Sequence, residues 1–144
     1  MVRSVVKIKE KKESKSYLRV KENPSKKYDY VINLKQTLVK KIDGEKFLID
    51  LHYIPDRYIL EAGSYKNYLG GIFEQLKESL DETSVLEEIS LNVIDDLCNE
   101  LVPFWIRVNV SFIGEDKVTG SRFHNVTIED RQPQWNNEAL LAKI

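Results

Sequence analysis

Apolar and polar residues alternate strictly in three segments of the chain, which is the pattern of half-buried β-strands. The first segment runs from Tyr28 to Leu38 and the second from Phe47 to Tyr53. The third is the clearest, and its apolar positions are Phe104, Ile106, Val108, Val110 and Phe112. A fourth strand is expected within Val118–Glu129.

Turn signals follow the first and the third of these strands. Asp43-Gly44 stands before the second strand, and Gly114-Glu115-Asp116 stands before the fourth. Short connections of this kind join antiparallel neighbours. The four strands are therefore expected as two β-hairpins.

Two segments between the hairpins carry apolar residues at helical spacing. The first helix is expected to begin near Ser64, a residue type that caps helix N-termini well. The second is expected to begin at Thr83 or Ser84 and to end before Pro103, which cannot continue a helix. The order β-β-α-α-β-β predicts an α+β domain, with two helices on one face of a four-stranded antiparallel sheet. The two open edges of such a sheet favour a homo-oligomer formed through them.

Charge divides the chain, whose 144 residues fit one domain. Residues 1–27 hold ten Lys and Arg against three Asp and Glu, whereas the rest holds twelve against twenty. We therefore expect a basic N-terminal arm at 1–27, a folded domain at 28–130 and a C-terminal tail at 131–144. The arm is interpreted as a loosely ordered solubilising tail or as a segment that binds RNA, because clustered lysines neutralise phosphates.

The cellular setting follows from what the sequence lacks. It has no run of 18 apolar residues and no apolar signal segment at its start, so no membrane partner is expected. A single cysteine favours a reducing compartment, and we expect the cytoplasm. The two histidines have no Cys or His at ligand spacing, so no metal site is expected.

Two motifs occur in the order found in one protein family. The first runs from Tyr53-Ile54-Pro55 to Tyr68-Leu69, and the second joins Val93–Leu97 to Pro103-Phe104-Trp105-Ile106-Arg107-Val108. With these motifs the chain resembles the tunnelling-fold (T-fold) proteins, and among them the NADPH-dependent 7-cyano-7-deazaguanine reductases. These are nitrile reductases of queuosine biosynthesis, a tRNA modification pathway. The resemblance implies a T-fold that binds a deazapurine at a subunit interface.

The reaction that the resemblance implies needs a cysteine thiolate, which attacks the nitrile to give a thioimide. Counted back from Pro55, that cysteine falls on Leu38, and the acid of the family falls on Glu45, a carboxyl that can still donate a proton. Cys98 lies on the second predicted helix and is interpreted as a packing residue. Whether the chain is an enzyme therefore stays open, although its family is one of oxidoreductases.

The binding residue implied by the resemblance is Glu87. The histidine and glutamate that open the second helix of the family fall on Leu86 and Glu87, and the glutamate would hold the N–H edge of the deazapurine. A carboxylate suits that task because it accepts parallel hydrogen bonds. The alternative is structural, since Ser84 and Glu87 have the spacing of a capping box.

The NADPH contacts implied by the resemblance fall on Glu61, Ser64, Lys66 and Tyr68. The family has a lysine where this chain has Gly63. The structural alternative makes Ser64 a helix cap, Lys66 a solvated lysine and Tyr68 a core residue.

Three functions remain for the structure to address. The first is reduction of 7-cyano-7-deazaguanine or a close relative. The second is a non-catalytic T-fold module that binds a purine or pterin through Glu87. The third is an RNA-associated relative that uses the basic arm.

Overall fold

The computed structural model describes residues 17–39, 46–76, 85–116, 118 and 120–144. The predicted proton donor Glu45, the predicted helix starts at Thr83 and Ser84, and residues 1–16 of the predicted arm lie outside the described residues.

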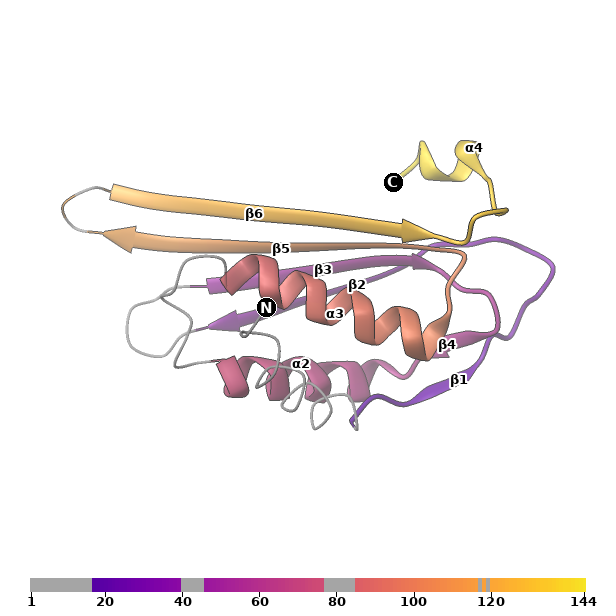
Figure 1. Cartoon of the computed structure of the whole chain (residues 1–144), viewed down its shortest axis with the longest axis horizontal. Helices are drawn as coiled ribbons and strands as arrows, with labels where there is room; N and C mark the ends of the chain where they lie inside the picture. Colours follow the sequence, from indigo (N-terminus) through magenta and orange to yellow (C-terminus); the bar gives the residue numbers. More distant parts are fainter. Residues whose placement is uncertain (1–16, 40–45, 77–84, 117, 119) are drawn as a thin grey trace.

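Four strands form the antiparallel sheet that the alternation predicts. They are β2 (Ile32–Val39), β3 (Lys46–Ile54), β5 (Trp105–Asp116) and β6 (Gly120–Arg131). Their order across the sheet is β2-β3-β5-β6, so the two hairpins meet where β3 pairs with β5. Figure 1 shows the long β5–β6 hairpin beside β3 and β2. Strands β2 and β6 are the two edges of this sheet.

Two helices run along the sheet, α2 (Ala62–Leu76) and α3 (Val85–Leu101). Helix α3 contacts β5 and β6, whereas α2 contacts β2 (Figure 1). Their apolar residues join one core with every second residue of the strands. The fold class is therefore α+β, in the predicted β-β-α-α-β-β order of a T-fold-like arrangement.

The core lies between the helices and one face of the sheet. Its strand residues are Phe47, Ile49, Leu51, Tyr53, Ile106, Val108, Val110 and Phe112, all at most 4% exposed. The opposite face is polar, and its side chains bond across strands: Arg107 to Glu129 at 3.1 Å and Asn109 to Thr127 at 2.7 Å. The period-2 pattern of β3 and β5 therefore predicted the buried face.

Two of the alternating segments begin earlier in the prediction than the strands do in the structure. Strand β2 begins at Ile32, and Tyr28 stands outside it with 65% of its surface exposed. Phe104 precedes β5 and stacks on Trp135 of the C-terminal tail, with ring centroids 6.1 Å apart. Trp105, on the polar face, is only 1% exposed, and the Arg107 guanidinium lies 5.0 Å from its ring centroid.

A second, two-stranded sheet was not predicted. It pairs β1 (Val20–Glu22) with β4 (Tyr58–Leu60), and Leu18 just before β1 is buried in the core. Residues 18–23 lie within the range expected to be a loosely ordered arm, yet they are part of the folded domain. Three-residue strands carry too few positions for the alternation to be read.

The start of α2 corrects the prediction of Ser64 as its N-cap. The helix begins at Ala62, and the backbone N–H of Tyr65 donates to the carbonyl of Glu61 at 3.2 Å. The Ser64 hydroxyl accepts from the backbone N–H of Arg19 at 2.9 Å and donates to the Glu61 carbonyl at 2.8 Å. Ser64 therefore ties the chain before β1 to the first turn of α2, a contact across 45 residues of sequence.

The C-terminal tail folds back over the start of the domain. It contains the short helix α4 (Glu138–Leu141). Trp135 Nε1 and Asn137 Nδ2 both donate to one carboxylate oxygen of Asp29, at 3.1 and 3.2 Å. Among the described residues, no helix has the length and apolar character needed to cross a membrane.

Candidate functional site

Four residues form a row across the helix-facing side of the sheet. Leu38 pairs with Phe47, Phe47 with Phe112, and Phe112 with His124. The Phe47 and Phe112 ring centroids are 5.0 Å apart. The ring of Phe73 on α2 packs against Phe47, with its centroid 5.3 Å away. The row thus places Leu38 on one open edge of the sheet and His124 on the other, three strand spacings or about 14 Å apart.

Leu38 occupies the position that the resemblance gives to the nucleophile. Its side chain is half-buried and lines a narrow crevice between the sheet and the helices. The other lining residues are all apolar: Phe47, Ile49, Leu69, Ile72, Phe73, Ile89 and Val110. None of these described lining residues carries a group that can attack a nitrile.

Glu87 lies in the first turn of α3, at the His124 end of the row. Its side chain is 42% exposed, but its Oε1 atom is shielded from solvent and has no hydrogen-bond partner among the residues that the structure describes. Within the described part of the chain, a basic group lies close to it: His124, with Nε2 4.0 Å from that oxygen. A helix N-terminus favours a carboxylate at this position. The capping-box alternative depends on Ser84, which lies outside the described residues.

The neighbouring position, Leu86, belongs to the core. Leu86 is 3% exposed and packs with Ile89 and Val93 on the buried side of α3. Its burial holds the first turn of the helix against the sheet. Glu87, one residue later, is thereby turned toward the surface at the β6 edge.

The four residues of the predicted cofactor box have different surroundings. Glu61 and Lys66 are exposed at the start of α2, whereas Ser64 is buried and bonded to the Arg19 backbone. Tyr68 is fully buried, and its hydroxyl donates to Asp96 Oδ2 at 2.7 Å. In the single chain, the hydroxyl groups of Ser64 and Tyr68 are thus already engaged in internal hydrogen bonds.

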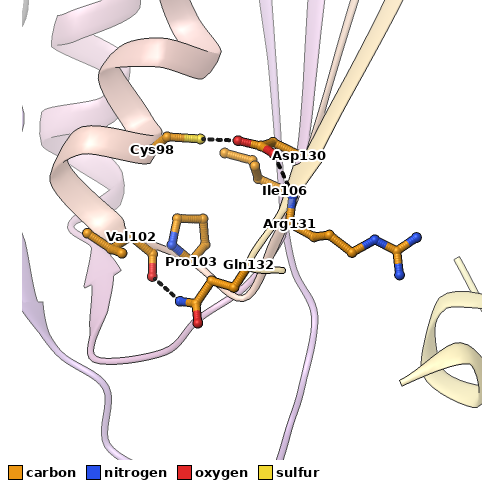
Figure 2. Close-up of a pocket in the computed structure, with 7 residues that line it drawn as sticks. All are labelled: Cys98, Val102, Pro103, Ile106, Asp130, Arg131 and Gln132. Atoms are coloured by element: carbon orange, nitrogen blue, oxygen red, sulfur yellow. Dashed lines mark hydrogen bonds between the residues drawn. The ribbon is translucent and has the colours of Figure 1, made fainter. Parts of the chain in front are cut away.

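Cys98 lies at the opposite end of α3 from Glu87, in a small cleft of about 120 Å³ (Figure 2). Its Sγ atom points toward Asp130, with Oδ2 at 3.9 Å, while Gln132 Nε2 donates to the carbonyl of Val102 at 3.1 Å. Val102, with φ 44°, has the left-handed conformation that ends many helices. The side chain of Arg131 points away from the cleft (Figure 2).

The surroundings of Cys98 keep it a thiol. Burial, first of all, and then the carboxylates of Asp130 and Asp95 together raise the pKa of Cys98 to about 11. The thiolate is the reactive form of cysteine. The prediction of a packing residue agrees with this environment.

Alkylation of Cys98 by iodoacetamide at pH 8 is expected to be roughly 200-fold slower than that of free cysteine, because the thiolate fraction is smaller by that factor. The rate should rise with pH up to about 11. Mass spectrometry measures the alkylated fraction without overlap from other sites, because the chain has one cysteine. Asp130→Asn should speed the reaction. A rate for the unchanged chain that levels off near pH 8 would contradict the assignment.

Taken together, the predicted site residues divide between the two ends of the domain. Leu38 and Glu87 share one end but lie at opposite edges of the sheet. The cofactor box starts at the other end, since Ser64 is nine residues, or about 14 Å of helix, from Phe73 above the row. A single chain therefore does not assemble all of these residues into one pocket.

Sequence reasoning missed His124. The residue lies on the helix-facing side of β6 with Val126 and Ile128, which pack against the core. That alternation was available in the sequence as the signal that His124 faces the helices. Its approach to Glu87, 37 positions away in the chain, depends on the pairing of β5 with β6.

Curated relatives of this chain share one name, NADPH-dependent 7-cyano-7-deazaguanine reductase. The protein of that name from Acidithiobacillus ferrooxidans is 29% identical over 129 residues, which cover 85% of this chain and 82% of the relative. The one from Syntrophus aciditrophicus is 32% identical over 114 residues, or 75% and 73% of the two chains. No protein-family model matches the sequence. On the strength of these relatives, the chain belongs to the family of the NADPH-dependent 7-cyano-7-deazaguanine reductases.

Proposed function

We propose that this protein binds a 7-deazapurine through Glu87 at an interface between two copies of the chain, and that it does not reduce a nitrile through a thioimide. The observation that carries the proposal is the pairing of a retained, surface-facing carboxylate at Glu87 with an aliphatic residue at Leu38. The relatives are named for 7-cyano-7-deazaguanine, which makes that compound the probe of choice.

The binding half of the proposal rests on the chemistry of Glu87. An N–H edge of a purine-like ring needs an acceptor, and a charged acceptor gives hydrogen bonds about twice as strong as a neutral one. Glu87 offers such an acceptor on a rigid element, because Leu86 and Ile89 on either side are buried.

The interface half rests on the two open edges of the sheet. Glu87 and His124 lie at the β6 edge, and Leu38 lies at the β2 edge. If β6 of one copy pairs with β2 of the next, the sheet continues in antiparallel order. Glu87 of one copy then faces the Leu38 crevice of its neighbour, which supplies an apolar wall for a planar ring.

The non-catalytic half rests on the sulfur chemistry of the chain. The thioimide mechanism needs a thiolate beside the bound nitrile. Leu38 cannot supply one, and Cys98, the single cysteine, is a thiol at the far end of α3. The ligand would therefore be held without being attacked.

The proposal does not include NADPH binding by this chain, although the relatives are named as NADPH-dependent. Ser64 and Tyr68 are committed to Arg19 and Asp96, which leaves Glu61 and Lys66 as the two box residues that a cofactor could reach. One lysine beside one glutamate is a poor match for the phosphates of a dinucleotide. The box as folded does not fit the cofactor.

Titration calorimetry with 7-cyano-7-deazaguanine is expected to show binding that Glu87→Gln weakens roughly 10- to 100-fold, because a charge-assisted hydrogen bond is lost. Glu138→Gln, in the exposed helix α4, is the matched control and should bind normally. In the same samples, NADPH should not be oxidised above the rate without protein.

Two results would contradict the proposal in different places. Turnover of NADPH by the unchanged chain would overturn its non-catalytic half. Equal affinities of the Glu87→Gln and Glu138→Gln proteins would remove Glu87 from the binding site.

A further inference from the structure

The Oε1 atom of Glu87 is an acceptor that the described structure leaves without a donor. It is shielded from solvent and has no hydrogen-bond partner in the described part of the chain, although the side chain as a whole is 42% exposed. Buried polar atoms in folded proteins nearly always have partners, so such an atom needs an explanation. Its position shows that one carboxylate oxygen faces the protein while the rest of the side chain faces outward.

His124 stands opposite this oxygen. Its Nε2 atom is 4.0 Å from Oε1, about 1 Å beyond the length of a charge-assisted hydrogen bond. The His124 side chain is 47% exposed, so its imidazole has room to turn. The backbones on both sides are fixed, because His124 pairs with Phe112 in the sheet and Glu87 follows the buried Leu86.

We infer that His124 is a positioning residue for Glu87: its imidazole N–H closes on Oε1 when a ligand binds, and this fixes Oε2 toward the N–H edge of the ligand. The inference rests on the proposed function and adds a second residue to that site. The ligand touches Glu87, and His124 acts through Glu87.

Desolvation of the Glu87 carboxylate is the physical reason why His124 would be needed beside it. A ligand seated on Glu87 removes water from the carboxylate, and an acceptor left without a donor in drier surroundings costs more than one near water. A histidine N–H that reaches Oε1 removes that cost. It also restricts the carboxylate to one orientation, so less freedom is lost when the ligand binds.

The test is a double-mutant cycle on the full chain, read by calorimetry with 7-cyano-7-deazaguanine. His124→Ala should weaken binding roughly tenfold, and His124→Gln, which keeps an N–H donor, should recover most of that loss. In a chain that already carries Glu87→Gln, His124→Ala should have no further effect. His52→Ala, at the other histidine of the chain, is the matched control, because His52 lies on the polar face of the sheet beside Asp50.

Each other outcome counts against a stated part of the inference. If the unchanged chain binds the probe and His124→Ala binds it equally well, the positioning role is overturned while Glu87 keeps its own. If His124→Ala weakens binding by the same factor with and without Glu87→Gln, His124 does not act through Glu87. If the unchanged chain does not bind the probe, the proposed function fails and the inference fails with it.

Discussion

Replacing Phe47 by alanine is expected to lower the free energy of unfolding by about 4 kcal/mol, the range for aromatic residues removed from cores. Phe47 is 1% exposed and touches Phe73 and Phe112 with ring centroids 5.3 and 5.0 Å away. The substitution leaves a cavity between the sheet and α2, and both ring pairs are lost. Urea unfolding followed by circular dichroism measures the effect.

Phe123→Ala is the matched control for Phe47→Ala. Phe123 lies on β6 and is 64% exposed, so its removal should change the free energy of unfolding by less than about 0.5 kcal/mol. Phe47 also connects Leu38 to Phe112 in the row across the sheet. A loss below about 1.5 kcal/mol for Phe47→Ala would show that this row is not the tightly packed centre of the core.

Tyr68→Phe is expected to lower the free energy of unfolding by about 2 to 3 kcal/mol, because it leaves Asp96 Oδ2 without the hydroxyl that donates to it. Both residues are fully buried, so water cannot replace the lost donor. Burial, first of all, and then Asp96 raise the pKa of Tyr68 well above its ordinary value, which keeps the hydroxyl protonated at neutral pH. Urea unfolding measures this change as well.

Tyr65→Phe makes the same chemical change three residues earlier on α2 and should have the opposite sign. The Tyr65 hydroxyl is buried and has no hydrogen-bond partner among the described residues, so its removal ends a desolvation cost and stabilises the fold or leaves it unchanged. The two rings stack with centroids 6.3 Å apart, and both substitutions keep that contact. If both substitutions changed the free energy of unfolding equally, the hydrogen bond from Tyr68 to Asp96 would not contribute to stability.

The central strands could be predicted from the sequence because their environment is simple. Val108 and Val110 have a helix layer on one side and polar neighbours on the other, so a period of two appears directly in the residue types. The same reasoning placed Leu38 on the helix-facing side of β2, where it lines the apolar crevice. Local pattern was sufficient wherever burial repeats along one element.

Features that depend on distant partners could not be predicted in this way. The sequence predicted Ser64 as a helix cap, but its hydroxyl accepts a hydrogen bond from the backbone N–H of Arg19. No pattern in the nearby sequence indicates that these two residues are in contact. The approach of His124 to Glu87 needs the pairing of β5 with β6 and the packing of α3 on both strands. The candidate site was therefore predicted at Glu87 and missed at His124.

The junction between β3 and β5 also determines how this chain must fold. Each hairpin joins strands that are neighbours in sequence, but the junction pairs Ile54 with Trp105, about 50 residues later. Bringing such distant residues together costs chain entropy before their contacts can stabilise the fold. We expect the hairpins to form first and their docking to set the folding rate. Since Phe47 and Phe112 meet at this junction, Phe47→Ala should act mainly by slowing folding rather than by speeding unfolding.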